Sequence, residues 1–417
     1  MNQVEMKRLF DTTDYIRIGG TEKELECANF IKSEIEKLGV EAHFESFKVQ
    51  SAEISECELT CSLGSIICKG YRNSDSTSKD GLTAPLYYLK GRSEFELSKC
   101  KGKIVLIIGY FGRFFYEDLL KHGAVGFITT TGIQTDSHDD IDNRELRGAV
   151  QEGLGKIPGV NINIKDAMRL VENDVKEVTL RLIQTETIGH SQNIVAEIKG
   201  RTDEVIAFSA HYDSVPLSHG VYDNMSGAVG IFAIMEKFLE NKVQPRYTLR
   251  FIWCGCEERG LLGSKAYTAM HDAELDKVKL NINLDMIGSI LGCGLACCTT
   301  EIKLVHYLEY MSLELGYSLV TEQGVYSSDS TPFADHKVPA MSFARLDPHD
   351  MSIIHNRYDT FAQMSIKHMF EDIDFIYAFA KRLDDAVFFP IGREIPEKLR
   401  EEIDKYLLRK RPETKVE

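Results

Sequence analysis

The sequence predicts an α/β fold whose mixed, largely parallel central sheet is flanked by helices. From residue 193 onward, short apolar runs of strand length alternate with longer segments of helical periodicity, which is the pattern of a buried parallel sheet. The chain has 417 residues, 43% of them apolar, which is enough for about two to three domains with substantial cores. The strand-like runs are residues 194–198, 205–209, 248–253, 281–285 and 339–343, and the main helical segments are residues 226–241, 301–315 and 366–382.

A helix and a smaller α/β segment precede this sheet. Residues 22–38 carry apolar side chains at helical spacing, with Thr21 as the N-cap and Gly39 as the stop. Residues 73–80 are rich in Ser, Asp and Lys and predict a loop, after which strand-like and helix-like segments alternate as far as about residue 182. This stretch therefore predicts a separate unit. Its expected elements are strands at residues 103–108 and 124–129 and helices at residues 116–122 and 164–173.

Composition and charge argue against several classes of function. The chain has 49 basic and 64 acidic residues, a net charge of −15, whereas nucleic acids and anionic lipids are bound by clustered positive charge. No apolar run approaches the roughly 18 residues of a membrane span, and the first residues lack the pattern of an export signal. We therefore expect a cytoplasmic protein with no nucleic-acid and no membrane partner.

The ten cysteines are irregularly spaced, and we expect them to be reduced thiols. Cys57, Cys61 and Cys68 form a cluster that a soft metal could use. Neither a CxxC pair nor a nearby histidine supports such a site, so buried or half-buried thiols are the prediction.

Metal-type ligands follow the ends of the predicted strands, where active sites of open α/β sheets form. His211 and Asp213 come directly after one run, and Asp223 lies in the loop before the helix that opens at Ser226. A further short run at residues 352–354 is expected to end in a ligand as well. The ligand-type residues after the later runs are Glu257, Glu258, Asp285 and His355.

Imidazole and carboxylate ligands suit Zn²⁺ in a catalytic role, because they leave one position open for water, whereas structural zinc sites favour thiolates. If Asp213 and one of the two glutamates have other roles, three carboxylates and two imidazoles remain as ligands, which permits two metal ions about 3.5–4 Å apart, with Asp223 on its tight loop as the natural bridge. Asp213, two residues after His211, can orient the imidazole. The sequence therefore predicts a site for two Zn²⁺ ions, and other divalent metals would also suit these ligands.

The adjacent carboxylates of Glu257 and Glu258 suggest two different roles. On a regular strand they would point to opposite faces, so that one binds metal and the other faces the substrate as a general base. The alternative is that single histidines and carboxylates after strands are caps or turn residues, and that the Glu pair lies on a solvated helix. His219, His336 and His349 are weaker candidates for the ligands, since none directly follows an apolar run.

Longer motifs surround these residues. They are His211-x-Asp213, Asp223-Asn224-x-Ser226-Gly227, Glu257-Glu258-x-Gly260-Leu261-x-Gly263-Ser264, Asn283-Leu284-Asp285-Met286-Ile287-Gly288, Ser328-Asp329 as far as Phe333, and His355 ahead of Asp359-Thr360.

Their order, from residue 193 to about residue 383, resembles that of the co-catalytic zinc exopeptidases of clan MH, which include bacterial leucine aminopeptidases, aminopeptidase Y and the glutamate carboxypeptidases. Residues 17–21 and the helix after them fit the family's opening segment. The resemblance implies the zinc aminopeptidase fold, Glu257 as the base and Asp213 as a partner of His211. The zinc ligands that it implies are His211, Asp223, Glu258, Asp285 and His355.

Residues 101–107, 123–128 and 157–162 resemble a protease-associated (PA) domain, an insert that many of these exopeptidases carry. The alternative is a generic small α/β insert. In both cases we expect a discontinuous peptidase domain. The predicted bounds are residues 1–50 and 186–392 for the peptidase domain, 51–185 for the PA-like insert, and 393–417 for a charged C-terminal tail with a helix at residues 397–408.

One departure from the family concerns the oxyanion. Some members place a tyrosine directly before the last histidine ligand, where it stabilises the tetrahedral intermediate, but this chain has Ile354 there. We expect Tyr326 to take that catalytic role, the alternative being a packing aromatic.

The preferred function is a zinc aminopeptidase in which a metal-activated hydroxide attacks the first peptide carbonyl and Glu257 transfers the proton. A carboxypeptidase or dipeptidase is the alternative. It would bind the C-terminal carboxylate through Arg345 or Arg357, unless these pair with Asp347 or Asp359. A non-catalytic receptor-like member and a one-zinc glutaminyl cyclase-like transferase fit less well, because the ligand set is complete. The expected partner is a peptide substrate, and the sequence leaves oligomerisation open.

Overall fold

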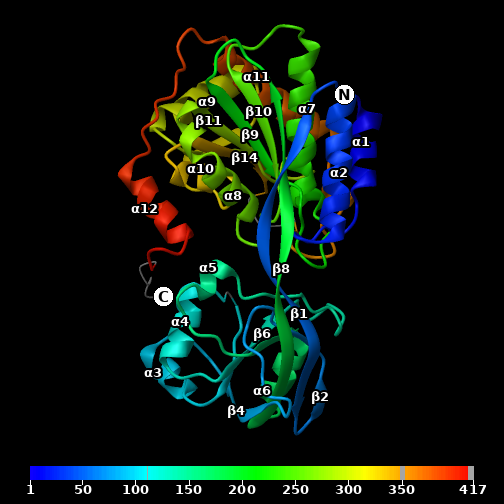
Figure 1. Cartoon of the computed structure of the whole chain (residues 1–417), viewed down its shortest axis with the longest axis vertical. Helices are drawn as coiled ribbons and strands as arrows, with labels where there is room; N and C mark the ends of the chain where they lie inside the picture. The colour runs from blue at the N-terminus through cyan, green and yellow to red at the C-terminus, as the bar shows by residue number, and fades with distance from the viewer. Residues whose placement is uncertain (110, 348–352, 412–417) are drawn as a thin grey trace. The chain divides into compact units, whose positions relative to one another are not determined.

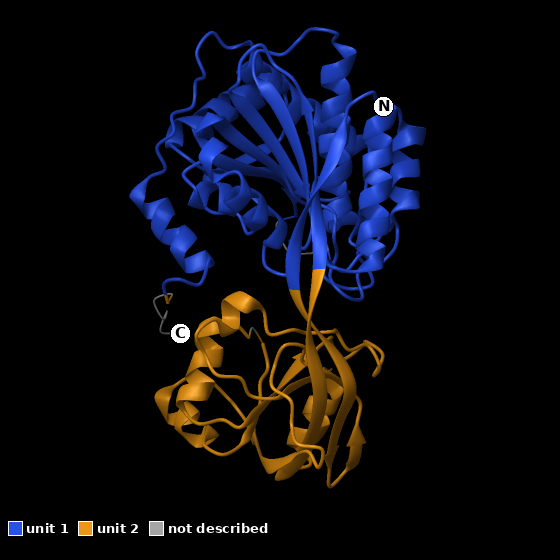
Figure 2. Cartoon of the chain, viewed as in Figure 1, with its two compact units in different colours: residues 1–49, 190–410 blue, residues 50–189, 411–417 orange. Residues whose placement is uncertain are grey.

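The computed structural model describes residues 1–109, 111–347 and 353–411 (Figure 1). The chain divides into two compact units (Figure 2). Unit 1 comprises Met1–Val49 and His190–Lys410, and unit 2 comprises Gln50–Gly189 and Arg411–Glu417, of which residues 412–417 are not described. The domain bounds expected from the sequence, with a separate tail at residues 393–417, and the identity of the insert as a PA domain stay predictions.

Unit 1 is built on a mixed, largely parallel sheet, as the sequence predicts. The strand order is β13-β12-β14-β11-β9-β10-β8. The pairs along β10, β9, β11 and β14 are parallel, as is the pair of β12 with β13, while β8 and β12 run antiparallel to β10 and β14. The strands are β8 (Glu177–Ile198), β9 (Val205–His211), β10 (Thr248–Cys254), β11 (Val278–Leu284), β12 (Cys293–Thr299), β13 (Leu319–Gln323) and β14 (Ala340–Leu346).

Helices cover both faces of this sheet (Figure 1). Alternate residues of β9 enter different cores: Ile206 and Phe208 join the core under α7, whereas Val205 and Ala207 join the core that includes residues of α8, α10 and α12. Helix α7 packs on β9, β10 and β11 and is itself covered by α1 and α11. The helices are α1 (Gln3–Thr12), α2 (Glu22–Lys37), α7 (Ser226–Glu240), α8 (Leu262–Met270), α9 (Ile302–Leu315), α10 (Ser330–Asp335), α11 (Ile366–Asp385) and α12 (Glu397–Tyr406).

Unit 2 is the smaller α/β unit that the sequence predicts. Strands β4, β5, β6 and β7 are parallel neighbours, β3 pairs antiparallel with β7, and β4 pairs antiparallel with residues 177–180 of β8, which belong to unit 2. The strands are β1 (Ala42–Cys61), β2 (Gly64–Ile66), β3 (Cys68–Gly70), β4 (Leu82–Tyr88), β5 (Ile104–Leu106), β6 (Gly126–Thr131) and β7 (Gly159–Asn163), and the helices are α3 (Glu94–Leu97), α4 (Arg113–Lys121), α5 (Gly148–Gln151) and α6 (Ile164–Glu172).

The long strand β1 was not predicted, and only residues 194–198 of β8 were expected, because much of the length of both strands is half exposed and polar. One local prediction is wrong. Residues 353–354, expected to end a strand, belong to no strand, and residue 352 lies outside the described residues. The N-cap of α2 is as predicted: the Thr21 side chain accepts a hydrogen bond from the Glu24 N–H.

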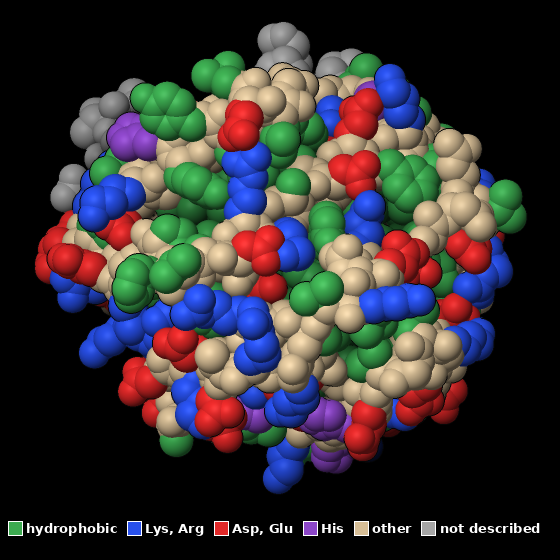
Figure 3. Space-filling view, turned by 90° about the horizontal axis from the view of Figure 1, so that it is seen from above, with side chains coloured by type: hydrophobic (Ala, Val, Ile, Leu, Met, Phe, Trp, Pro, Cys, Tyr) green, Lys and Arg blue, Asp and Glu red, His purple; other side chains and the backbone are tan. Residues whose placement is uncertain are grey.

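All ten cysteines are free thiols. No helix within the described ranges has the length and apolar character that crossing a membrane requires. On the face that Figure 3 shows, Lys and Arg side chains lie among Asp and Glu side chains.

Candidate metal centre and active site

The ligand-type side chains gather at one edge of the unit 1 sheet. Strands β9, β10 and β11 are parallel neighbours, so their carboxyl ends meet. His211 is the last residue of β9, and Asp285 directly follows β11. Asp223 lies in the segment Val221–Met225, immediately before α7, and Glu257 and Glu258 follow β10.

Two groups of donor atoms share Asp223. In the first, His211 Nε2 lies 3.2 Å from Asp223 Oδ1 and 3.8 Å from Asp285 Oδ1. In the second, His355 Nε2 lies 3.0 Å from Asp223 Oδ2 and 3.2 Å from Glu258 Oε1. Within each group the donor atoms lie within 4.8 Å of one another. The two oxygens of one carboxylate therefore face two different ligand groups, which is the geometry of a bridging ligand.

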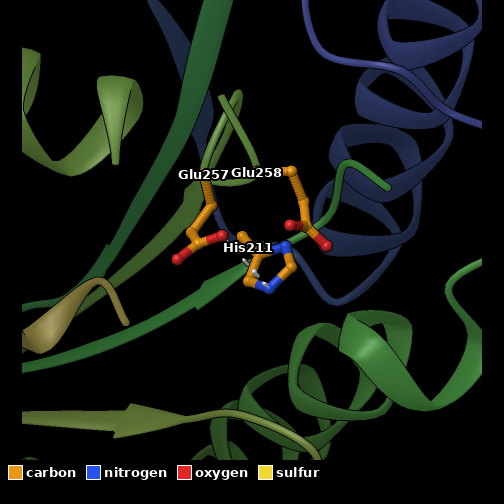
Figure 4. A group of neighbouring side chains, drawn as sticks. All are labelled: His211, Glu257 and Glu258. Atoms are coloured by element: carbon orange, nitrogen blue, oxygen red, sulfur yellow. Dashed lines mark ion pairs between the residues drawn. The ribbon is translucent and has the colours of Figure 1, made fainter. Parts of the chain in front are cut away.

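A third group of donor atoms shares His211 with the first group and Glu258 with the second. His211 also lies near both glutamates, with 3.9 Å between His211 Nε2 and Glu257 Oε2 (Figure 4). The carboxylates of Glu257 and Glu258 lie on two sides of the His211 imidazole in that view. The strand geometry expected for the two glutamates is wrong: they lie in a turn beyond Cys254, where Cys256 has φ +52°. This turn brings both carboxylates into the same cluster.

The geometry of His355 also differs from the expectation. It lies in a loop at φ +60°, not at a strand end, and its side chain is 52% exposed, whereas that of Asp223 is 7% exposed. His219 pairs with Asp14 at 2.7 Å and His336 with Asp272 at 2.9 Å, and neither joins a donor group within the described residues. His349 lies outside the described residues.

Buried charge gives the cluster its electrostatic character. Burial raises the pKa of Asp285 to about 7 and that of Glu257 well above its usual range. Burial also acts to raise the pKa of Asp223, but hydrogen bonds from His211 and His355 outweigh it and hold this pKa below the usual range. For His355, burial lowers the pKa, whereas Glu258 and Asp223 raise it more, to about 11. The carboxylates outnumber the imidazoles, and a cation would neutralise the excess.

The donor set fits zinc. Its atoms are the nitrogens and oxygens that catalytic zinc sites use. Asp285 Oδ1 is buried and has no hydrogen-bond partner among the residues that the structure describes. A buried oxygen without a partner is costly unless a cation occupies the position it faces.

Backbone N–H groups hold the ligand-bearing segments in place. Asp213 accepts hydrogen bonds from the N–H groups of Glu257 (2.9 Å) and Glu258 (3.3 Å), and its Oδ1 lies 3.4 Å from His211 Nδ1. Asp213 therefore supports the glutamate turn in addition to the imidazole. Gly227 is required where α7 meets β11, since a Cβ there would lie 2.2 Å from the Leu284 carbonyl oxygen.

Sequence reasoning missed two supporting carboxylates. Asp359 accepts hydrogen bonds from the N–H groups of Tyr222 (2.7 Å) and Asp223 (3.1 Å). Glu24, near the start of α2, accepts one from the N–H of Cys256 (3.0 Å) and is buried. Asp359 was part of a quoted motif, but no local pattern distinguishes a buried carboxylate at position 24 from the exposed acids around it.

Tyr326 lies beside the cluster. Its hydroxyl is buried and has no hydrogen-bond partner within the described ranges. Burial, followed by the nearby charge of Asp285, raises its pKa well above the usual value. Such a hydroxyl can donate to a ligand that enters the site.

The two arginines considered for a substrate carboxylate differ in their surroundings. Arg345 is buried and binds Asp372 of α11 through Nε (3.0 Å) and Nη2 (2.6 Å), a partner that the sequence analysis did not consider. Arg357 is exposed. The metal-type groups of the described chain contain no cysteine, although the Cys57 and Cys68 sulfurs lie 3.4 Å apart.

Comparison with known proteins places the site in a family context. Residues 193–378 match the model of Peptidase family M28. Aminopeptidase YwaD of Bacillus subtilis is 32% identical over 278 residues, which are 66% of this chain and 58% of that protein. Leucine aminopeptidase 2 of Arthroderma otae is 35% identical over 196 residues, 45% of this chain and 38% of that protein. The aligned regions thus span less than two thirds of these relatives.

Solved structures resemble the whole chain more completely. A zinc aminopeptidase from Bacillus subtilis superposes with a TM-score of 0.76 at 26% identity, over 94% of this chain and 98% of that one. An aminopeptidase from Aneurinibacillus sp. strain AM-1 has a TM-score of 0.73 at 21% identity, over 94% and 96% of the two chains, and this second likeness concerns the fold alone.

Proposed function

We propose that the chain, whose residues 193–378 match the model of Peptidase family M28, is a zinc-dependent aminopeptidase that removes N-terminal residues from peptides. The observation that carries the proposal is the division of the Asp223 carboxylate between two donor groups. One zinc ion would be held by His211, Asp223 and Asp285, and a second by Asp223, Glu258 and His355. The names of the relatives, aminopeptidases in each case, support the same activity.

When bound at these residues, zinc would supply a water of lowered pKa and would polarise the substrate carbonyl. The side chains of the protein transfer the proton, stabilise the developing negative charge and support the ligands. Glu257, which belongs to neither of the two groups that share Asp223, accepts a proton from the attacking water and delivers it to the leaving amine. The unpartnered Tyr326 hydroxyl donates to the oxygen that gains negative charge. Asp213 and Asp359 hold the ligand-bearing backbone while charge develops.

Charge favours the N-terminus of the substrate over its C-terminus. The carboxylates of Asp213, Asp223, Glu257, Glu258 and Asp285 outweigh the charge of two divalent cations by about one unit, which suits an α-ammonium group. Arg345, one of the candidates for a C-terminal carboxylate, is neutralised by Asp372. Arg345 is therefore not free to bind the C-terminal carboxylate of a substrate, as the carboxypeptidase alternative requires.

The direction of cleavage is tested with three peptides that differ only at their ends: Leu-Gly-Gly, its N-acetyl form and its C-terminal amide. Loss of a buried charge pair costs about 2–5 kcal/mol, so acetylation is expected to lower kcat/KM by about 30- to 5,000-fold. Amidation should have little effect. The opposite result, with the acetylated peptide cleaved normally and the amide resistant, would establish the carboxypeptidase alternative. A catalytically impaired Glu257→Gln protein, purified identically, controls for contaminating peptidases.

The ten free thiols support a reducing location such as the cytoplasm as part of this proposal. Thiol titration of protein purified without reductant checks it: ten titratable thiols in denaturant are expected, and disulfide-bonded protein would argue for an oxidising compartment.

A further inference from the structure

Arg17 lies in the N-terminal segment between α1 and α2, outside the region that matches the family model. Its side chain is fully buried. Within the described part of the chain, the guanidinium group donates hydrogen bonds to backbone carbonyl oxygens alone. Its acceptors are Tyr212 (Nε, 2.8 Å), Gly220 (Nη2, 2.9 Å), and His219, Thr13 and Tyr15 (Nη1, 2.5, 2.8 and 2.9 Å).

Three of these carbonyls, those of Tyr212, His219 and Gly220, belong to the segment from His211 to Asp223, which carries two of the metal-type ligands. Tyr212 lies between His211 and Asp213, and Gly220 lies three residues before Asp223. Arg17 therefore joins the two ends of the loop that separates the first ligand from the bridging one. A side chain with a single donor could not reach both ends at once, whereas the planar fork of a guanidinium presents several donors in fixed directions.

The backbone of Arg17 reinforces this connection. Its N–H donates to Ser214 Oγ (2.9 Å), and its carbonyl oxygen accepts from the Ser214 N–H (3.1 Å). Arg17 is thus attached to the loop by both its main chain and its side chain. The room around this junction is small, because a Cβ at Gly220 would lie 2.5 Å from the Asp223 carbonyl oxygen and 3.2 Å from Arg17 Nη2.

The charge of Arg17 acts on the buried Asp359 carboxyl, whose pKa it lowers against the larger effect of burial, but no hydrogen bond joins the two side chains within the described residues. Burial of a guanidinium is costly, and an apolar side chain would avoid that cost. Core packing alone does not require a guanidinium at this position. The guanidinium is needed for the carbonyl groups that converge on it, three of which, those of Tyr212, His219 and Gly220, lie on the ligand-bearing segment.

We propose that Arg17 is a positioning residue for the metal centre: by joining the carbonyls of Tyr212 and Gly220, it holds His211 and Asp223 at the spacing that two zinc ions require. The inference rests on the proposed function and concerns how the same site is held. Arg17 touches neither metal nor substrate in this account. Its removal is expected to weaken zinc binding while leaving the sheet and its two cores intact.

The test uses the full chain, made zinc-free with a chelator, and measures zinc affinity by competition with a chromophoric chelator. Arg17→Ala is expected to lower the affinity by about 10- to 100-fold, the usual effect of losing a group that orients metal ligands. Arg8→Ala is the control, because Arg8 lies nearby in sequence on α1, is 48% exposed and pairs with Glu34. That control should keep wild-type zinc affinity.

Chemical rescue distinguishes positioning from general destabilisation. Guanidinium chloride, far below denaturing concentrations, should restore zinc affinity to Arg17→Ala, whereas urea, a neutral molecule of the same shape, should not. Arg17→Lys keeps the charge and most of the volume, so it carries the test if Arg17→Ala does not fold. It should bind zinc more weakly than wild type, since an ammonium group cannot replace the fork.

The outcomes separate the two levels of the account. A wild-type chain that binds two zinc ions but cleaves no peptide would refute the proposed function and leave the inference standing. Folded Arg17 variants with wild-type zinc affinity, or equal rescue by urea and guanidinium, would overturn the inference and leave the proposed function standing.

Discussion

Replacement of Glu257 by glutamine tests the division of roles between the two adjacent glutamates. Glutamine has the same shape but cannot accept a proton. The Glu257 N–H would still donate to Asp213, so the turn should keep its conformation. The two donor groups that share Asp223 do not include Glu257, so zinc should stay bound. The expected result is loss of turnover in a folded protein with normal zinc content.

The magnitude follows from the position of the carboxylate. Glu257 Oε2 lies 3.9 Å from His211 Nε2, and its side chain is 11% exposed, so bulk water cannot readily replace it. A positioned general base contributes about 10²- to 10⁴-fold to rate, equivalent to about 2.7–5.4 kcal/mol of barrier. We expect kcat to fall by that factor, with KM changed by less than about threefold because the residue is not a uniform binding group.

The assay combines steady-state rates on leucine p-nitroanilide with elemental analysis of the dialysed protein. Glu258→Gln is the matched comparison, since Glu258 Oε1 lies 3.2 Å from His355 Nε2 in a donor group. That variant should lose zinc as well as activity. Equal zinc loss in the two variants, or a Glu257→Gln protein with wild-type turnover, would show that base and ligand are assigned wrongly.

Three further changes test other parts of the account. His271→Gln removes the imidazole that is hydrogen-bonded to Glu45 (2.8 Å), a contact that raises the pKa of His271. A raised pKa stabilises the folded state below about pH 6.5, and this stabilisation is lost as the pH rises through the folded-state pKa. The melting temperature of the variant should therefore be lower than that of the wild type at about pH 5.5 but not at about pH 9. Phe251→Ala empties a fully buried site where the ring stacks on Phe208 at 4.8 Å, and urea unfolding should show a loss of about 3–5 kcal/mol, a loss under about 1 kcal/mol contradicting the packing. Tyr326→Phe should lower kcat by about 10²- to 10³-fold at unchanged zinc content, whereas an unchanged kcat would make this residue a packing aromatic.

The central strands and the ligands that follow them directly could be predicted from the sequence. His211 and Asp285 each terminate a run of buried residues in β9 and β11, and such a run is visible without any structure. His355 is a different case. It was found through the order of motifs, while the strand expected before it does not exist in residues 353–354.

The groups that support the ligands could not be predicted, because their role depends on contacts distant in sequence. The acceptors of the Arg17 guanidinium at Tyr212 and Gly220 lie 195 and 203 residues along the chain. The N–H group that binds Glu24 belongs to Cys256, 232 residues away. A single charged residue in a polar N-terminal segment is normally exposed, so only the fold reveals that these two are buried.

Titration of the zinc-free chain with Zn²⁺ tests most directly the claim that Asp223 divides its oxygens between two metal sites. Bound zinc is measured by elemental analysis while the rate on Leu-Gly-Gly is followed. The account predicts two zinc ions per wild-type chain, loss of both from Asp223→Ala, and full binding by His219→Ala, whose imidazole pairs with Asp14 outside the cluster. A wild-type chain that is fully active with one zinc ion, or an Asp223→Ala chain that retains two, would contradict it.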